Sequence, residues 1–285
     1  MTRSEAGPRS VKRTLDISTV CGLGLAIAGI LGGLKLEGGR FSDISQFTAA
    51  LIVLGGTAGA VMITTPFSTL RSALAALPSV LFKTPTQTDA VIQDILRLAT
   101  KARKTGLVSL ENDALTAGDP FLSKALMLAV DGSDLQDVRR ILELDLSLIE
   151  RHGEAEAKVF EAAGGFAPTI GIIGAVLGLI QVMKHLEDMD AVGHGIAVAF
   201  VATVYGVAAA NLLLLPAANK LKANLQHTLE LKELMLEGTL AIAEGLNPKL
   251  ISIKLDGYRN GAAPTRAKSA KVVQSESSSR PANVA

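Results

Sequence analysis

The stretch that decides the fold runs from Gly164 to Lys222 and contains two apolar runs, GGFAPTIGIIGAVLGLIQVM at 164–183 and GIAVAFVATVYGVAAANLLLLPAANKLK at 195–222. Each run is long enough to cross the roughly 30 Å hydrocarbon core of a bilayer, and neither has a charged side chain in its interior. Their notable polar side chains are Thr169, Thr203, Tyr205 and Asn211, and each run contains one proline, Pro168 or Pro216. This pattern indicates two membrane helices that pack on other helices.

The composition requires both membrane-spanning and water-exposed segments. Of the 285 residues, 48% are hydrophobic and the mean hydropathy is +0.37, which is too apolar for an ordinary soluble protein. However, 19% of the residues are charged, which is too many for a chain that lies wholly in a membrane. A formal net charge of +1 without a long basic face argues against nucleic acid as a partner. The single cysteine, Cys21, excludes an internal disulfide and a Cys-based metal site.

Two further apolar runs precede the deciding stretch. The first extends from about Ile17 to Leu34, and we interpret it as a retained span because no small-residue cleavage site precedes a soluble mature domain. The second extends from about Phe47 to Thr65 and stops near Pro66. Four spans in total place both termini on the same side of the membrane.

Basic residues near the ends of the spans predict the orientation. They are Arg3, Arg9, Lys12 and Arg13 before the first span, Arg71 and Lys83 after the second, and Lys220 and Lys222 after the fourth. The loops on the other face contain fewer basic residues, and the one between the third and fourth spans has Glu187, Asp188 and Asp190 against Lys184. By the positive-inside rule, the termini and the long insert after the second span are expected to be cytoplasmic.

The insert is patterned as helices. One broad helical face carries Val91, Ile92, Ile95, Leu98, Ala99 and Ala102, with Arg97, Lys101 and Lys104 on the opposite stripe, until Gly106 breaks the pattern. A short helix is expected over 121–130, with Asp119 as its N-cap and Pro120 at its first position. A third helix from about Leu135 to Ala163 is expected to continue into the third span, and the fourth span to continue past Pro216.

We therefore expect an all-α membrane protein with four transmembrane helices and a helical cytoplasmic domain inserted between helices 2 and 3, in which long helices 3 and 4 extend into the cytoplasm. The expected boundaries are a cytoplasmic N-terminus at 1–16, transmembrane helices 1 and 2 at 17–65, a cytoplasmic helical domain at 66–163, transmembrane helices 3 and 4 at 164–216, a cytoplasmic helical extension at 217–258 and a disordered tail at 259–285. The tail is small and polar, without an apolar period.

Small residues recur at intervals of four in all four spans. The pairs are Gly22 with Ala26, Ala28 with Gly32, Gly55 with Gly59, Gly174 with Gly178, and Ala202 with Gly206 and Ala210. Such spacing lets the backbones of membrane helices approach closely. Because small residues occur in every span of a four-span chain, we favour an oligomer over a single bundle.

The spans contain no Asp or Glu in their interiors. An ion pathway generally needs an ionisable group or dense oxygen ligation at its centre, despite the free-energy cost of placing a charge there. If this protein helps to conduct an ion, the titrating carboxylate must come from another chain.

Four segments carry a resemblance to a known family. They are KARKTGLVSLENDA at 101–114, DPFLSKALMLAVDGSD at 119–134, APTIGIIGAVLGLIQVM at 167–183 and IAVAFVATVYGVAAANLLLLPAANKLK at 196–222. In this order and in the four-span layout, the chain resembles the flagellar motor stator A subunit, the MotA/PomA family, which is distantly related to TolQ and ExbB. The resemblance extends from the first span to about Pro248.

The resemblance implies a place in a larger machine in the bacterial inner membrane. In that family, five A subunits surround two B subunits, and the membrane helix of each B subunit supplies an essential aspartate. Ion passage is coupled to rotation, and the cytoplasmic domain of the A subunit pushes on the rotor protein FliG. The two membrane prolines of the family match Pro168 and Pro216, and its charged rotor-contact pair matches Arg103 and Glu111. Thr169 and Thr203 are the hydroxyls placed near the prospective ion pathway.

Each of these residues also has a simpler interpretation. The prolines lie near helix ends, where they are tolerated or introduce a kink. The threonine hydroxyls can donate to the carbonyl one turn earlier. Arg103 and Glu111 can be solvated charges, and Arg103, which flanks the apolar face, can instead brace its helix against a neighbour.

The sequence supports other functions less well. A TolQ/ExbB-like proton-channel subunit energising an outer-membrane system is the nearest alternative, although such proteins usually have three spans with the large loop after the first. A secondary transporter lacks support because the spans have no charge and no second repeat of broken helices, and a membrane scaffold stays open. There is no nucleotide-binding loop, catalytic triad or metal-ligand cluster, so neither an enzyme nor a cofactor is expected. The sequence leaves open proton against sodium, which B subunit is used, and a main or auxiliary stator.

Overall fold

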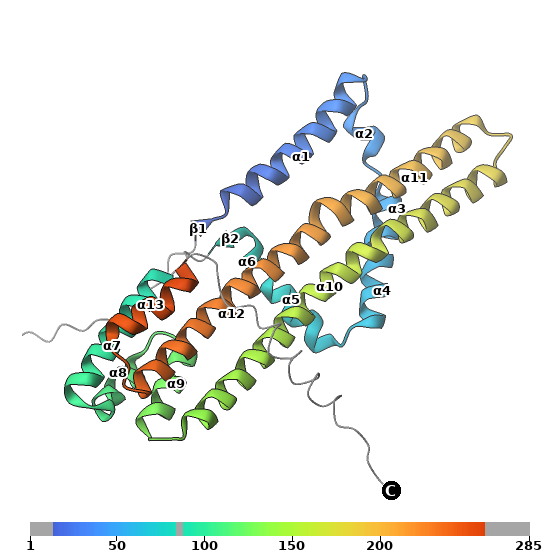
Figure 1. Ribbon diagram of the computed structural model, residues 1–285. Helices are drawn as coiled ribbons and strands as arrows, with labels where there is room; N and C mark the ends of the chain where they lie inside the picture. The colour runs from blue at the N-terminus through green and yellow to red at the C-terminus, as the bar shows by residue number, and fades with distance from the viewer. Residues whose placement is uncertain (1–13, 84–87, 260–285) are drawn as a thin grey trace, which may run out of the picture. The chain divides into compact units, whose positions relative to one another are not determined.

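The computed structural model describes residues 14–83 and 88–259. The basic residues expected before the first span and the tail from residue 260 onward lie outside these ranges. The structure is mostly helical, and its only pairing of strands within these ranges joins β1, Thr14–Leu15, to β2, Phe82–Lys83 (Figure 1).

The helices follow in this order along the chain. They are α1 (Ile17–Leu36), α2 (Phe41–Ile44), α3 (Phe47–Ala50), the π-helix η1 (Leu51–Gly55), α4 (Gly56–Thr64), α5 (Phe67–Ala76), α6 (Pro78–Leu81), α7 (Thr88–Thr105), the 3₁₀-helix η2 (Leu107–Leu110), α8 (Glu111–Thr116), α9 (Pro120–Val130), α10 (Leu135–Lys184), α11 (Met189–Ala208), the π-helix η3 (Ala209–Leu214), α12 (Leu215–Ala243) and α13 (Pro248–Arg259).

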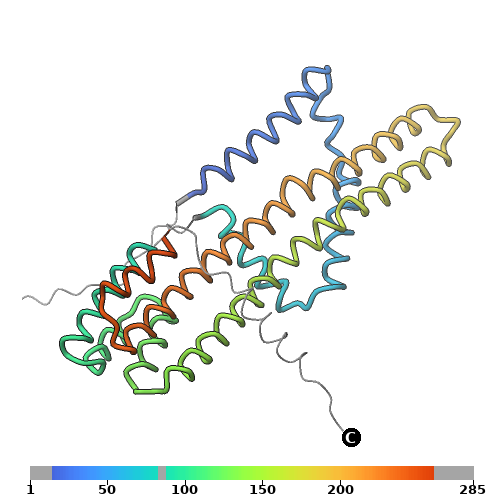
Figure 2. Tube along the Cα trace, viewed as in Figure 1, coloured from blue at the N-terminus to red at the C-terminus, as the bar shows by residue number. Residues whose placement is uncertain are grey.

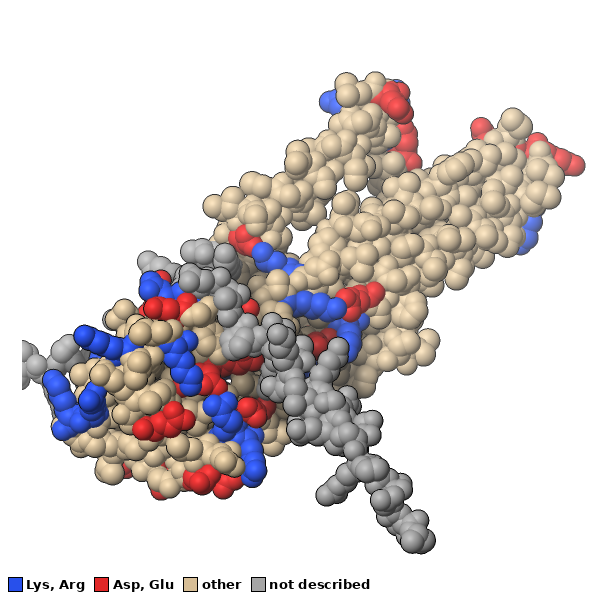
Figure 3. Space-filling view, in the orientation of Figure 1, with Lys and Arg blue, Asp and Glu red and all other residues tan. Residues whose placement is uncertain are grey.

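Within the described residues, four helical segments are long and apolar enough to cross a membrane. They are Ile17–Leu36, Phe41–Thr64, Leu135–Lys184 and Met189–Ala243. The visible faces of α1 and of the apolar parts of α10 and α11 carry no charged atoms between their ends, and acidic atoms gather at the loop that joins α10 to α11 (Figure 3). These observations confirm the expected helical class with four candidate spans.

The helix signals in the sequence correspond to the observed helix ends. Asp119 caps α9 by accepting hydrogen bonds from the backbone N–H groups of Phe121 (2.7 Å) and Leu122 (3.4 Å), as its position before Pro120 predicted. Gly106 ends α7 with a φ of +84°, a conformation that favours glycine. The expected continuation of the third helix is also confirmed, because α10 is unbroken over 50 residues.

The chain forms two compact units. The first contains the described residues up to 83 together with 144–229, and the second contains 88–143 together with 230–259. The chain passes from one unit to the other at 143–144, within α10, and at 229–230, within α12.

In the first unit, α10 and α11 pack in antiparallel register through glycines (Figure 2). A Cβ added to Gly206 would lie 2.5 Å from the carbonyl oxygen of Ala167, and one added to Gly178 would lie 2.8 Å from the backbone nitrogen of Ala199. The backbones are therefore closer than any side chain at these positions would permit.

The glycines of the other small-residue pairs have open space beside them in the described part of the chain. A Cβ added at Gly22, Gly32, Gly55 or Gly59 would meet no described atom within 4 Å, whereas one added at the neighbouring Gly56 would lie 2.7 Å from Ile170. Of the five expected sets of small residues, the two in α10 and α11 thus make close contacts within this chain.

Three polar side chains of α12 make contacts with other elements of the first unit. Lys220 forms an ion pair with Asp16, the N-cap of α1, and Lys222 pairs with Glu161 of α10 at 2.6 Å. Asn224 donates a hydrogen bond to the carbonyl of Ser79 at 2.9 Å. Because none of the residues of α1 is buried, these contacts at its N-terminal end are important for holding it to the unit.

The second unit has an apolar core of its own. Its largest fully buried side chains come from α7, η2, α9, the first turns of α10, the last turns of α12, and α13, and include Ile95, Leu110, Leu126, Leu142, Leu234, Leu240, Ile251 and Leu255. Glu237 connects two of these elements, because it accepts from Arg139 at 2.8 Å and from Lys254 at 2.6 Å.

Candidate functional site

The four residues expected at an ion pathway all belong to the α10–α12 part of the first unit. Pro168 lies inside α10 and is half-buried, and Thr203 lies in α11. Their segments meet, because a Cβ added to Gly171 would lie 3.4 Å from the Cα of Thr203 and 2.9 Å from the carbonyl oxygen of Ala202. The backbone around Pro168 is therefore packed directly on the backbone around Thr203.

Both threonine hydroxyls donate to the helix backbone. Thr169 Oγ1 donates to the carbonyl of Phe166 at 2.8 Å, and Thr203 Oγ1 donates to the carbonyl of Ala199 at 3.2 Å. This is the simpler of the two arrangements considered for them. A hydroxyl that donates in this way keeps its oxygen lone pairs, so it still has acceptor capacity for a cation or a water molecule.

Pro216 follows an irregularity that the sequence did not reveal. The six residues Ala209–Leu214 form the π-helix η3, and Pro216 is the second residue of α12 and is exposed. Proline has no N–H with which to continue the α-helical ladder, and π-turns occur often at functional sites. The packing continues across this point, since a Cβ added to Gly164 would lie 2.6 Å from a methyl carbon of Leu215.

Tyr205, two residues after Thr203 in α11, makes a contact with a segment far away in the sequence. Its hydroxyl donates to the carbonyl of Ile44 at 2.5 Å and accepts from the backbone N–H of Gln46 at 3.4 Å. These bonds fasten the segment between α2 and α3 to α11. A phenol in a membrane helix needs a polar partner, so the sequence indicates that Tyr205 has such a partner but not which residue provides it.

Arg103 and Glu111 lie in the second unit on either side of one turn. Arg103 is in the last turn of α7, Glu111 is the first residue of α8, and Gly106 and η2 separate them. Both side chains are exposed, and neither forms an ion pair with any residue in the described part of the chain. Within the described residues, Arg103 thus has no ion pair that would brace α7 against a neighbour.

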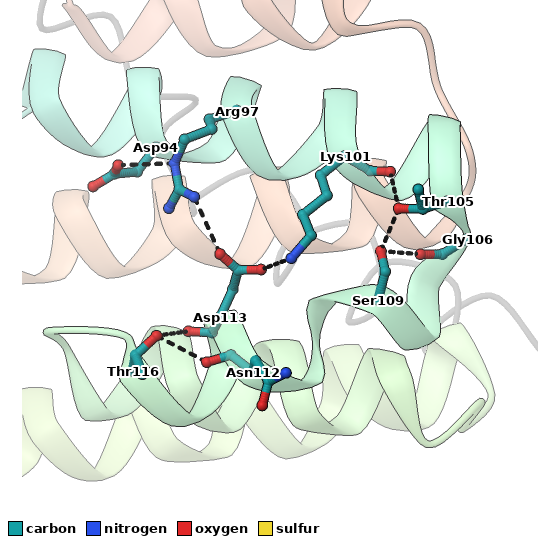
Figure 4. A network of polar contacts seen from close by, with 9 residues as sticks. All are labelled: Asp94, Arg97, Lys101, Thr105, Gly106, Ser109, Asn112, Asp113 and Thr116. Carbon is teal, nitrogen blue, oxygen red and sulfur yellow. Dashed lines mark hydrogen bonds and ion pairs between the residues drawn. The ribbon is translucent and has the colours of Figure 1, made fainter. Parts of the chain in front are cut away.

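An interhelical ion-pair network beside this turn was not predicted (Figure 4). Asp113 of α8 accepts from Arg97 Nη1 at 3.1 Å through one carboxylate oxygen and from Lys101 Nζ at 2.6 Å through the other. Burial opposes ionisation of Asp113, but the hydrogen bonds from Lys101 and Arg97 and their charges outweigh it, so the pKa of Asp113 lies below its usual range. Two cations one helical turn apart, followed after a glycine turn by an acidic residue, are the sequence signal for this network.

Comparison with known proteins places the chain in a class and then in a family. Residues 113–233 match the MotA/TolQ/ExbB proton channel family, and residues 20–106 match the N-terminal region of motility protein A. The second half of the chain thus resembles a class of proteins described as a proton channel family.

The relatives narrow this class. Motility protein A of Bacillus subtilis is 36% identical over 248 residues, which cover 86% of this chain and 91% of the relative. The structure of C. jejuni MotAB has a TM-score of 0.81 and 33% identity, covering 86% of this chain and 96% of the matched one. The flagellar MotAB stator complex from Bacillus subtilis has a TM-score of 0.78 and 34% identity, with 87% and 97% covered. The chain belongs to the motility protein A family.

Proposed function

We propose that this chain is the A subunit of a flagellar motor stator, which forms with a B subunit an ion-conducting complex that converts transmembrane ion flow into torque on the rotor. The observation that supports this proposal most strongly is the likeness of this chain, along most of its length, to a chain in each of two MotAB structures. Four helical segments long and apolar enough to span a membrane, within the described residues, are consistent with it.

The chemistry of the helix pair requires a second chain. Neither α10 nor α11 has a carboxylate in the interior of its apolar run, so these helices have no group that could take up and release a proton at that depth. We assign Pro168, Thr169, Thr203 and Pro216 to the surface that faces the B subunit, whose membrane aspartate would supply the titrating group. The π-helix before Pro216 and the proline inside α10 are two places where the regular α-helical hydrogen bonding is interrupted.

Further parts of the proposal concern assembly and position. Five copies of this chain are proposed to surround two B subunits in the bacterial inner membrane, with both termini in the cytoplasm. The second unit is proposed as the cytoplasmic part, in which Arg103 and Glu111 contact the rotor protein FliG. The exposure of both side chains supports this role, because an exposed charge can pair with a complementary charge on a partner.

A role as a TolQ/ExbB-like energiser of an outer-membrane system is less well supported. Residues 20–106, which match the N-terminal region of motility protein A, include most of the first candidate span and all of the second.

Deletion of the gene for this chain tests the function. In a strain without other stator genes, the deletion is expected to abolish swimming while leaving flagellar filaments assembled, because torque generation is lost and export is intact. Filaments are counted by electron microscopy and rotation is recorded from tethered cells. The control is the same strain with the wild-type gene restored, which should swim again. Continued rotation in the deletion strain would contradict the proposal.

A further inference from the structure

We propose that Asp113 is a positioning residue that fixes the placement of Glu111 relative to Arg103. This inference rests on the proposed function, in which these two residues form the rotor contact. Asp113 itself is not the contact, since only 17% of its side chain is exposed and both of its carboxylate oxygens are occupied.

The helix that carries Glu111 needs such an anchor. The helix α8 has six residues, whereas isolated helices shorter than about 12–15 residues are marginal in water. Its orientation must therefore come from contacts with its neighbours. Leu110 and Ala114 are fully buried on one side of it, and Asp113 adds the ion pairs to α7.

The two ion pairs constrain both sliding and rotation of α8. Arg97 and Lys101 are one turn apart on α7, and each binds a different oxygen of the Asp113 carboxylate (Figure 4). Any displacement along α7 lengthens at least one charge-assisted hydrogen bond. Glu111 precedes Asp113 by two residues, about 200° around the helix, so fixing Asp113 toward α7 turns Glu111 away from it.

The turn itself is fixed at its other end by hydroxyl groups. The Thr105 hydroxyl lies 2.7 Å from Ser109 Oγ and 2.9 Å from the carbonyl oxygen of Lys101, and its single hydrogen is donated to one of these two acceptors at a time. Ser109 Oγ lies 2.7 Å from the carbonyl of Gly106, to which it donates. The chain between Arg103 and Glu111 is therefore held by the threonine–serine pair on one side and by Asp113 on the other.

Asp113 also determines which cations of α7 stay unpaired. It neutralises Arg97 and Lys101, while Arg103 and Lys104 are exposed and form no ion pair with the described residues. The turn thus presents two unpaired cations and one unpaired anion, Glu111, to a partner of complementary charge.

The test compares Asp113→Asn with the control Asp94→Asn in the full stator complex. Asp94 also pairs with Arg97, at 3.7 Å, but it lies on the same helix and its side chain is 60% exposed, so its loss leaves α8 attached. Asp113→Asn is expected to raise hydrogen-exchange rates of amides in 107–116 about tenfold, and to lower torque at high load with stator recruitment unchanged. Asp94→Asn is expected to change neither.

Two further variants separate position from charge. Asp113→Glu keeps a carboxylate at this position, so it should retain part of the torque that Asp113→Asn loses. The triple variant Arg97→Glu, Lys101→Glu, Asp113→Lys keeps the attraction with reversed signs and should restore slow exchange and torque together. Slow exchange without torque in the triple variant would overturn a positioning role, because the charge itself would then be required. Unchanged exchange in Asp113→Asn would also overturn it.

Arg103→Glu tests the rotor contact separately, because it leaves the Asp113 network in place. Normal torque in Arg103→Glu would overturn the proposed contact and the inference built on it. A torque defect in Arg103→Glu combined with normal torque in Asp113→Asn would overturn only the role of Asp113.

Discussion

At the scale of single residues, the ion pair between Asp16 and Lys220 is the clearest determinant of how the first helix is held. The hydrogen bond from Lys220, followed by that from Ser18, keeps the pKa of Asp16 well below its usual range, although burial opposes this. The same carboxylate caps α1. Replacement by asparagine retains a good N-cap and removes only the charge, so it isolates the ion pair.

We expect Asp16→Asn to lower the thermal midpoint of the purified protein at pH 7. Because the folded-state pKa is lowered, the contribution is fully present above the unfolded-state value of about 3.9 and is lost as the pH falls from there through the folded-state pKa. The difference from wild type should therefore be constant from pH 8 to about pH 5 and shrink below about pH 4. Thermal midpoints measured in nanodiscs across this pH range check the prediction. The control is Lys222→Met, which removes the neighbouring ion pair with Glu161. A difference that grows on acidification would contradict the assignment.

Side-chain partners were the part of the site least accessible from sequence. Asp119 was identified as a cap because its partners are two and three residues away. The partners of Asp16 and Tyr205 lie 204 and 161 residues away, and no local spacing identifies them. The exposure of Arg103 and Glu111 depends on the shape of the turn between them. We infer that Asp113 fixes this shape, and the local apolar periodicity of the sequence does not reveal that role.

At the scale of elements, the glycine contact between α10 and α11 determines how closely the proposed ion-pathway segments meet. Gly206→Ala is expected to destabilise the protein by about 1–3 kcal/mol, because the new methyl group would overlap backbone atoms that have no rotamer to relieve the clash. Gly193→Ala on the same helix is the matched control, since its Cβ would meet no described atom within 4 Å. Denaturation in detergent measures both, and equal stabilities would refute the close contact.

Element boundaries were predictable wherever a local signal fixed them. Pro66, Gly106 and Pro120 coincide with helix boundaries in the structure, because each changes the backbone hydrogen bonding or dihedral angles at its own position. The π-helices η1 and η3 were not predictable, since an extra residue in a helical turn leaves the apolar pattern of a membrane span unchanged. The same limitation applies to which of two adjacent glycines, Gly55 or Gly56, contacts α10.

At the scale of the whole molecule, the exposed apolar surface accounts for the need for partners. Many large apolar side chains of the four candidate spans are exposed, including Leu25, Ile63, Ile172 and Phe200. In a membrane such side chains face lipid or other chains. A single chain with this surface and without its own intramembrane carboxylate is a component of an assembly, which agrees with its family.

The proposed orientation gives a final prediction for the molecule in its membrane. In a Cys21→Ala background, single cysteines at Glu187, in the loop between α10 and α11, and at Asn247, between α12 and α13, occupy exposed positions. A membrane-impermeant maleimide added to intact cells with a permeable outer membrane should label position 187 and leave position 247 unlabelled, because basic residues adjoin the spans on the inner side. Both positions should react after the inner membrane is opened, which controls for their accessibility. Labelling of position 247 in intact cells would contradict the proposed orientation. Arg103 and Glu111 would then lie where no cytoplasmic rotor could reach them.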